Sequence, residues 1–132
     1  MKPNIYQEFI HIVIGILKNT KNEVLVTRRR DDAHLGGLLE FPGGKLEANE
    51  SPEEALKREL KEETQIDDPT IKYKFFENQA TVAEYFDFYL GYCDEEYECI
   101  LDYENTDWGW FNMENLPPTL FPTLYSSLVR IF

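Results

Sequence analysis

The sequence predicts a single α+β domain in which helices pack on a β-sheet. Its 132 residues suit one domain of ordinary size. Hydrophobic residues make up 42% of the chain, which is enough for a packed core. Strand and helix patterns follow one another without a regular βαβ alternation, and no internal repeat or linker separates them. We therefore expect residues 1–132 to form one domain.

The first predicted elements form a β-hairpin. Residues Phe9 to Leu17 are rich in Ile and Val and predict a buried strand. Asn19 to Asn22 predicts a turn, and Val24 to Thr27 predicts the second strand. Four of the seven glycines then fall between Gly36 and Gly44, which indicates a loop.

A helix is predicted over Pro52 to Thr64. The residues Ser51-Pro52-Glu53-Glu54 form a capping box, with proline at the first helical position. The helix is expected to end before Asp67-Asp68-Pro69, because proline disfavours helical backbone in the residue before it.

The second half of the chain predicts three more strands and a final helix. The strands are expected at Ile71 to Glu77, Val82 to Tyr92 and Trp108 to Phe111. Leu116-Pro117-Pro118 predicts a turn, and the last helix is expected to begin near Pro122.

The charge of the chain excludes one class of partner. With 13 basic and 25 acidic residues, the formal net charge is −12. Residues 94–107 contain seven acidic residues and no basic one. Such a surface does not neutralise an extended nucleic acid. Phosphate groups, if bound, are expected to be met locally through a divalent cation.

Nothing in the sequence predicts a membrane segment or export. The apolar stretch from Phe9 to Leu17 is far shorter than the ~20 residues that span a bilayer, and it lacks signal-peptide features. Cys93 and Cys99 suggest neither a disulfide framework nor a metal clamp. We expect a cytoplasmic protein without membrane contact.

Three glutamates of the predicted helix share its apolar face. At about 100° per residue, Glu62 and Glu63 lie within about 60° of Glu59, on the side that also carries the leucines. Like charges at these spacings repel each other. A hard divalent cation such as Mg²⁺ or Mn²⁺ turns the repelling carboxylates into a ligand set. The alternative is a solvated, glutamate-rich helix with no ligand.

Residues Gly44 to Ile66 resemble the Nudix box, G-x5-E-x7-R-E-U-x-E-E-x-G-U, in which U is aliphatic. One position departs from the pattern, since Gln65 stands where the family has glycine. A glycine suits a left-handed helix end, so this change costs about 1 kcal/mol and removes no ligand. The matching residues are Gly44, Glu50, Arg58, Glu59, Leu60, Glu62, Glu63 and Ile66.

The resemblance extends over most of the chain to the MutT-type nucleoside triphosphate pyrophosphohydrolases. Arg28 to His34, Leu39 to Lys45, the first hairpin and the segment from Trp110 to Pro118 are similar to theirs. The resemblance implies a mixed β-sheet between helices, an α/β/α sandwich, with the box as a loop-helix-loop.

The resemblance also implies a metal site. Glu59, Glu62 and Glu63 would bind Mg²⁺ with the backbone carbonyl of Gly43, and Mn²⁺ would substitute. Glu59 or a neighbouring glutamate would take the proton of the attacking water. Glu104 would add a carboxylate from a loop.

Two of these implied roles have explicit alternatives. Arg58 would hold a carboxylate in position, or it forms only a surface ion pair. Glu104 lies six residues before Trp110, as the family spacing requires, but Glu98 in the same acidic segment is a rival.

The substrate contacts are implied in the same way. Arg29 and His34 match positions near the substrate phosphates, although a solvated strand end and a loop histidine are the alternatives. Glu40 and Phe41 match positions near the nucleoside, and Phe41 is as readily a core residue. Leu120 stands where a base-reading Asn is found in the 8-oxo-dGTP-hydrolysing members, so a sharp preference for that base is not expected.

These features predict a Mg²⁺-dependent hydrolase that converts a nucleoside triphosphate, modified or oxidised forms included, to a monophosphate and pyrophosphate. An alternative substrate is ADP-ribose, a dinucleoside polyphosphate or an RNA 5′ end. A nucleotide-binding module without catalysis is a third possibility, disfavoured because every box glutamate is present. The expected partner is a small nucleotide, and the sequence leaves monomer and homodimer open.

Overall fold

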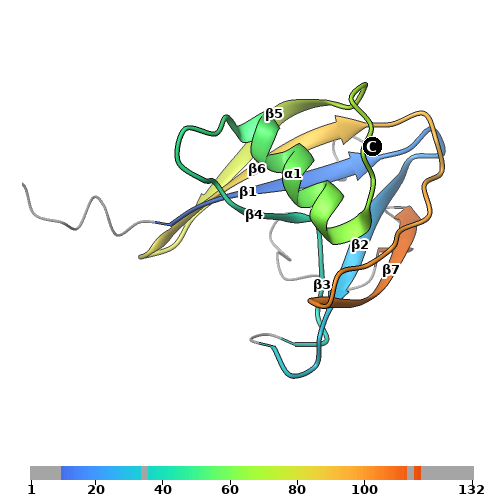
Figure 1. Cartoon of the computed structure of the whole chain (residues 1–132), viewed down its shortest axis with the longest axis horizontal. Helices are drawn as coiled ribbons and strands as arrows, with labels where there is room; N and C mark the ends of the chain where they lie inside the picture. Colours follow the sequence, from blue (N-terminus) through green and yellow to red (C-terminus); the bar gives the residue numbers. More distant parts are fainter. Residues whose placement is uncertain (1–9, 34–35, 113–114, 117–132) are drawn as a thin grey trace, which may run out of the picture.

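A computed structural model describes residues 10–33, 36–112 and 115–116. These residues form one helix beside a seven-stranded sheet (Figure 1). His34, Leu120 and the helix expected from Pro122 lie outside the described residues. The elements are β1 (Ile10–Lys18), β2 (Glu23–Arg29), β3 (Leu39–Glu40), β4 (Gly43–Lys45), α1 (Pro52–Thr64), β5 (Lys72–Ala80), β6 (Glu84–Tyr92) and β7 (Asn105–Asn112).

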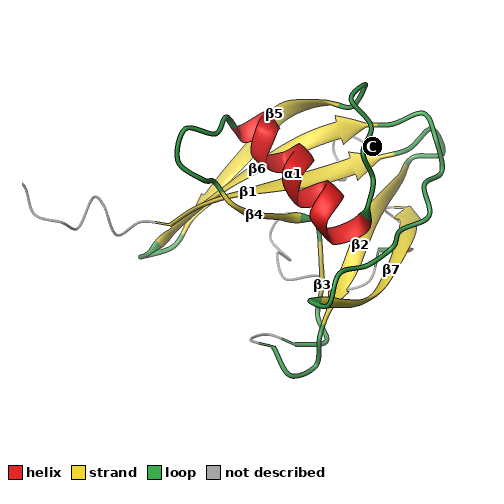
Figure 2. Ribbon diagram, viewed as in Figure 1, coloured by secondary structure: helices red, strands yellow, loops and turns green. Residues whose placement is uncertain are grey.

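The sheet is mixed, as the α+β prediction requires. Its strands are ordered β3-β2-β1-β6-β5, with β4 paired to β1 and β7 paired to β2. Strands β1 and β6 run parallel, and every other pairing in the described sheet is antiparallel. Figure 2 shows α1 lying across one face of the sheet. The opposite layer of the expected sandwich would begin near Pro122, outside the described residues.

The first hairpin is confirmed. Strands β1 and β2 pair antiparallel, with Lys18 opposite Val24. The Asn19 side chain closes the turn, because its Oδ1 accepts hydrogen bonds from the backbone N–H groups of Lys21 and Glu23 at 2.9 and 3.0 Å. Asn22 takes a left-handed backbone with φ 62°, a conformation that asparagine tolerates well.

Both faces of β1 are buried, which explains its unbroken apolar run. Ile14 and Ile16 pack in one cluster with Phe88 and other residues of β2, β3 and β6. Val13 packs in a second cluster, against the Leu56 side chain of α1. The strand therefore reads as continuously hydrophobic, as strands covered on both sides do.

Helix α1 begins and ends at the predicted residues. Ser51 Oγ accepts from the Glu54 N–H, and the Glu54 side chain accepts from the Ser51 N–H, which completes the capping box. Gln65 follows the last turn with φ 65°, and its N–H donates to the Lys61 carbonyl. The left-handed helix end expected at Gln65 is thus present. This backbone conformation costs steric energy in a residue that has a Cβ, whereas glycine would adopt it freely.

Several features of the sheet differ from the prediction. Strand β5 continues three residues past its predicted end, to Ala80, and β7 begins three residues before its predicted start, at Asn105. The short strands β3 and β4, on either side of Pro42, were not predicted. They have two and three residues, and they form because neighbouring strands offer pairing partners, which local sequence does not reveal. Val82 was placed in a strand but is 97% exposed, in the turn that precedes β6. Thr81 Oγ1 accepts from Ala83 N and Glu84 N and closes that turn.

In the part of the chain that the structure describes, no helix has both the length and the apolar character that crossing a membrane requires.

Candidate active site

A cavity of about 660 Å³ lies between the helix, β4 and the segment before β7. It brings together most of the residues that the sequence singled out, although they come from four separate segments. Glu98 and Glu40 do not line it. The lining residues are Arg29, Gly43, Gly44, Lys45, Glu47, Arg58, Glu59, Glu62, Glu63, Asp102, Tyr103 and Glu104.

Glu63 is the most deeply buried carboxylate of this cavity, with 6% of the residue exposed. Its Oε2 accepts a hydrogen bond from the Gly43 N–H at 3.0 Å. Burial raises the pKa of Glu63 well above its ordinary value, and repulsion from Glu59 and Glu40 adds to the effect. A charged Glu63 is therefore costly in this position without a cation.

Glu59 lies beside Glu63 on the inward face, and 16% of its side chain is exposed. Burial raises its pKa too, while the Arg58 guanidinium opposes the shift. A Cβ at Gly44 would lie 2.4 Å from Glu59 Oε1, closer than real atoms approach. Position 44 therefore needs glycine for the carboxylate to lie against the backbone.

The predicted inward placement of Glu62 needs correction. Its side chain is 57% exposed, so Glu62 lies at the rim of the cavity and not on the buried face. Leu56 and Leu60 anchor the helix to the sheet and lie on the other side of Glu59, which turns Glu62 toward solvent.

Arg58 holds several carboxylates at once, and its main partner is one to which the sequence assigned no role. Its Nε and Nη2 donate to Glu50 at 2.7 and 3.0 Å. Its Nη1 donates to Glu59 at 2.8 Å and reaches Glu62 at 3.4 Å, while Nη2 also donates to the Lys45 carbonyl. These contacts raise the pKa of Arg58. Only 23% of the Arg58 side chain is exposed, so its ion pairs are partly buried, which favours the positioning role over a solvated surface pair.

The segment before β7 forms the opposite wall. Glu104 lines the cavity, whereas Glu98 is exposed and does not, which favours Glu104 over its rival. Sequence reasoning missed Asp102, which also lines the cavity. Asp102 Oδ1 accepts from the Glu104 N–H at 3.2 Å and from Asn105 Nδ2 at 3.0 Å. This local turn is common after Asp, but the acidic residues around it hid the signal.

The predicted substrate residues divide into three groups. Arg29 lines the cavity and pairs with Glu40 at 3.2 Å. Glu40 lies behind Arg29, and burial raises its pKa. Phe41 is only 2% exposed and packs in the core, so its nucleoside contact is corrected in favour of the core alternative. His34 and Leu120 lie outside the described residues.

The cavity offers carboxylate oxygens, the ligand type that a hard divalent cation prefers. They are carboxylates, two of them half-buried or buried with raised pKa values, next to the backbone of a glycine pair. Among the described residues, no three acidic, histidine or cysteine side chains form a ready-made metal cluster. The Arg58 guanidinium instead balances part of the negative charge.

Comparison with known protein families shows that the NUDIX domain matches residues 10–130 of this chain. This chain belongs to the Nudix family.

Curated proteins similar to this Nudix domain include 8-oxo-dGTP diphosphatases and a CTP pyrophosphohydrolase. An 8-oxo-dGTP diphosphatase of Escherichia coli (strain K12) is 53% identical over 57 residues, which are 43% of this chain and 44% of the relative. A CTP pyrophosphohydrolase of the same organism is 36% identical over 78 residues, 59% of this chain and 48% of the relative. The aligned regions thus span about half the length of these curated relatives.

A solved MutT structure, from work on Aliivibrio salmonicida and Vibrio cholerae, covers more of the chain. It is 31% identical with a TM-score of 0.71 and covers 93% of this chain and 98% of its own. The mixed sheet with its helix is therefore the Nudix fold, as the sequence resemblance implied.

Replacing Glu63 with Gln is expected to raise the melting temperature of the metal-free protein. Gln keeps an acceptor for the Gly43 N–H and removes the charge that Glu59 repels. Because folding raises the pKa of Glu63, the folded state loses stability as the pH rises above the ordinary carboxyl value. The gain should therefore be small near pH 5 and about 3 °C or more near pH 8, measured by thermal unfolding in EDTA.

Glu62→Gln is the matched control, since that side chain is mostly exposed. Its melting temperature should stay within about 1 °C of the wild type. A Glu63→Gln protein that melts below the wild type at pH 8 would contradict the role given to buried charge.

Proposed function

We propose that this chain is a divalent-metal-dependent pyrophosphohydrolase of nucleoside triphosphates, modified or oxidised forms included. The observation that supports it most is the buried Glu63 beside Glu59, facing Glu104 across one cavity. Burying mutually repelling carboxylates costs stability, and a cation that bridges them to phosphate oxygens offsets that cost. The names of the curated relatives point to the same reaction class.

The residues that would hold Mg²⁺, with Mn²⁺ as a substitute, are Glu59, Glu62, Glu63, Glu104 and the Gly43 carbonyl. When bound, the metal neutralises charge that develops on the phosphate oxygens.

Glu59, or a neighbouring glutamate, accepts a proton from the attacking water. The water oxygen forms a bond to the α- or the β-phosphorus of the triphosphate, and the bond from that phosphorus to the oxygen that bridges the two breaks. The leaving group, pyrophosphate in the first case and the nucleoside monophosphate in the second, departs with the electrons of the broken bond. Arg58 is a positioning residue, because it donates directly to Glu59 and is itself anchored by Glu50. Arg29 lines the same cavity and would offer positive charge to the phosphates.

A second candidate keeps the chemistry and changes the substrate to another nucleoside diphosphate derivative, such as ADP-ribose, a dinucleoside polyphosphate or an RNA 5′ end. An RNA pyrophosphohydrolase of Gluconacetobacter diazotrophicus, 39% identical over 62 residues, supports considering it. The net charge of −12 weighs against a long RNA. A nucleotide-binding module without catalytic activity is the least favoured function, because binding alone would not require every glutamate of the Nudix box.

Activity is expected to depend on a divalent cation. Pyrophosphate and phosphate release from a panel of nucleotides should vanish in excess EDTA and return with Mg²⁺ or Mn²⁺. The same panel separates the two candidate activities. Release of a monophosphate and pyrophosphate from a nucleoside triphosphate identifies the pyrophosphohydrolase, whereas turnover of ADP-ribose, a dinucleoside polyphosphate or an RNA 5′ end identifies the second candidate. Full activity in EDTA would refute the metal role, and binding without turnover on every nucleotide would favour the binding module.

Glu104→Gln is expected to lower kcat about tenfold or more while changing KM less. The carboxylate acts on charge that develops in the transition state, so its loss reduces turnover more than binding. Glu98→Gln is the control, because Glu98 belongs to the same acidic segment but does not line the cavity. Steady-state kinetics at one Mg²⁺ concentration measures kcat and KM of the two variants. A loss of kcat in Glu98→Gln with little change in Glu104→Gln would assign the role to Glu98.

Base selectivity is expected to be modest. A leucine in place of a base-reading asparagine, as at position 120, can discriminate only by shape, which is worth about 10- to 200-fold for each missing contact, whereas paired hydrogen bonds reach about 10⁴. We expect kcat/KM for 8-oxo-dGTP, dGTP, dCTP and dATP to lie within about two decades of one another. A preference for 8-oxo-dGTP above about a thousandfold would show that other side chains read the base.

A further inference from the structure

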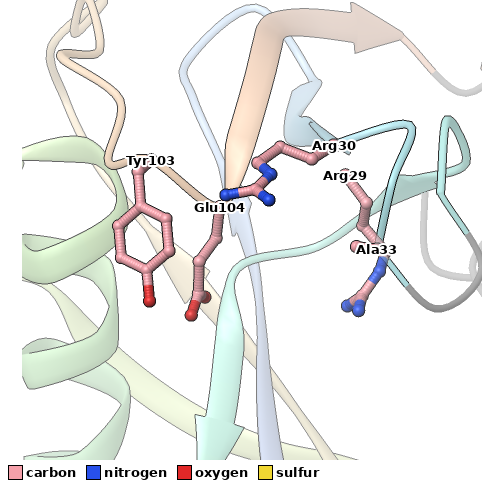
Figure 3. A pocket seen from close by; sticks show the side chains of 5 residues that line it. All are labelled: Arg29, Arg30, Ala33, Tyr103 and Glu104. Atoms are coloured by element: carbon pink, nitrogen blue, oxygen red, sulfur yellow. The ribbon is translucent and has the colours of Figure 1, made fainter.

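The wall of the cavity that carries Glu104 is the end of an irregular segment. Residues 93–104, here called the strap, connect β6 to β7, and this stretch, all of it described by the structure, contains no helix or strand. A segment without the regular hydrogen bonds of a helix or sheet is held by individual contacts. Figure 3 shows the end of the strap, where the side chains of Tyr103 and Glu104 extend in the same direction. The position of Glu104 in the cavity therefore depends on the contacts that hold the strap.

Two backbone hydrogen bonds join the strap to the end of α1. The Ile100 N–H donates to the Thr64 carbonyl at 2.9 Å, and the Asp102 N–H donates to the Glu63 carbonyl at 3.3 Å. The last carbonyls of a helix have no partner within it, and the strap supplies partners here. Glu63 thus has its carboxylate in the cavity and its carbonyl bonded to the strap, so it connects the two walls. The bond at Asp102 is long, since N–H···O bonds prefer about 2.9–3.0 Å, and it needs support from elsewhere.

Tyr97 anchors the strap ahead of these bonds. Its hydroxyl donates to the Asp68 carboxylate, and its carbonyl accepts from the Trp110 Nε1–H at 2.9 Å. The Tyr97 ring packs against the cluster of buried residues that includes Leu60 and Ile66. One residue thus ties the strap to the loop after α1, to β7 and to the core.

The partner of this hydroxyl is itself held in place. Asp68 lies in the loop between α1 and β5, and its Oδ1 accepts from the Thr70 N–H and the Thr70 hydroxyl at 2.9 and 2.6 Å. Hydrogen bonds from Thr70 and Tyr97 lower the pKa of Asp68, so the carboxylate is charged near neutral pH. A hydrogen bond to a charged acceptor is roughly twice as strong as one to a neutral acceptor. The hydroxyl of Tyr97, and not its ring alone, therefore contributes to the anchor.

The neighbouring contacts of the strap do not replace this anchor. Glu96 pairs with Lys21, but both side chains are more than half exposed, and exposed ion pairs contribute little to stability. The Cys93 N–H donates to the Lys18 carbonyl at 2.9 Å, which fixes the strap where it leaves β6. The hydroxyl of Tyr97 is therefore the side-chain contact best placed to hold the strap ahead of its bonds to α1.

We propose that Tyr97 is a positioning residue of the active site: its hydroxyl, through Asp68, holds the strap so that Glu104 faces Glu63 across the cavity. The effect on turnover and on metal affinity rests on the proposed function. Without the hydroxyl, the Glu104 carboxylate occupies its place in a smaller fraction of molecules. Such a loss lowers the apparent metal affinity by that fraction, and it lowers kcat more than it changes KM.

The first test is the binding of Mn²⁺ to the metal-free full chain, measured by titration calorimetry. Tyr97→Phe keeps the ring in the core and removes the hydroxyl, and it should weaken the Kd about threefold to tenfold. In the Glu104→Gln background, the same change should alter the Kd by less than about twofold, because the carboxylate that Tyr97 positions is absent. A role in stability alone would not produce this dependence on Glu104. Melting temperatures show whether each variant is folded.

The second test is steady-state kinetics at one Mg²⁺ concentration, well below the melting temperatures. Tyr97→Phe should lower kcat about threefold to tenfold and change KM by less than about twofold. Added to Glu104→Gln, it should lower kcat by less than about twofold more. Asp68→Ala removes the acceptor from the other side of the contact and should produce losses at least as large as those of Tyr97→Phe.

Tyr92→Phe is the matched control, because it removes a tyrosine hydroxyl at the end of β6, immediately before the strap. Tyr92 is 53% exposed, and its ring lies against the Lys18 ammonium. Its Kd and kcat should stay within about twofold of the wild type. Wild-type values in Tyr97→Phe or in Asp68→Ala, or equal losses with and without the Glu104 carboxylate, would each overturn the proposal.

The two tests separate this inference from the proposed function. If the wild type hydrolyses nucleotides and the losses from Tyr97→Phe and Glu104→Gln are additive, only the positioning role is refuted. If the wild type binds Mn²⁺ and hydrolyses nothing, the proposed function fails and the Mn²⁺ titrations decide on Tyr97. A wild type that neither binds Mn²⁺ nor turns over a nucleotide would overturn both.

Discussion

The burial of the Glu63 carboxylate next to Glu59 is the constraint around which the rest of the site is arranged. A charged group costs much free energy in a poorly hydrated environment, and a second carboxylate nearby adds repulsion. Leu56 and Leu60 anchor α1 to the sheet from the same side of the helix. Because the leucines must pack against the sheet, the carboxylates beside them are drawn out of solvent as well. Carboxylates and leucines therefore share one side of a short helix.

The neighbouring residues limit that cost in two ways. The Gly43 N–H donates to Glu63, and the missing side chain of Gly44 leaves room for Glu59 against the backbone. Arg58 supplies positive charge to Glu59 and Glu62 and is itself fixed by Glu50. These contacts allow the carboxylates to lie close together. They come from the glycine pair, from Arg58 and from Glu50.

The sheet determines which segment faces these carboxylates. Strand β7 pairs with β2, so the residues just before it, Asp102 to Glu104, lie opposite α1. The same pairing brings Arg30 within a backbone hydrogen bond of Glu104, although 74 positions separate them in the sequence. The carboxylate-lined cavity is a consequence of this one antiparallel contact.

The sequence by itself determined the local features of this protein. The capping box, the left-handed end at Gln65 and the Asn19 turn follow from short-range stereochemistry, and all were found. Of the three glutamates predicted on the inward face, Glu59 and Glu63 were found there, because helical periodicity places them on the leucine face. Only the tertiary structure decided the exposed position of Glu62, the burial of Phe41, the pairing of Glu50 with Arg58 and the placement of Asp102 beside Glu63. Each depends on which distant segments pack together, and periodicity within one segment carries no information about that packing.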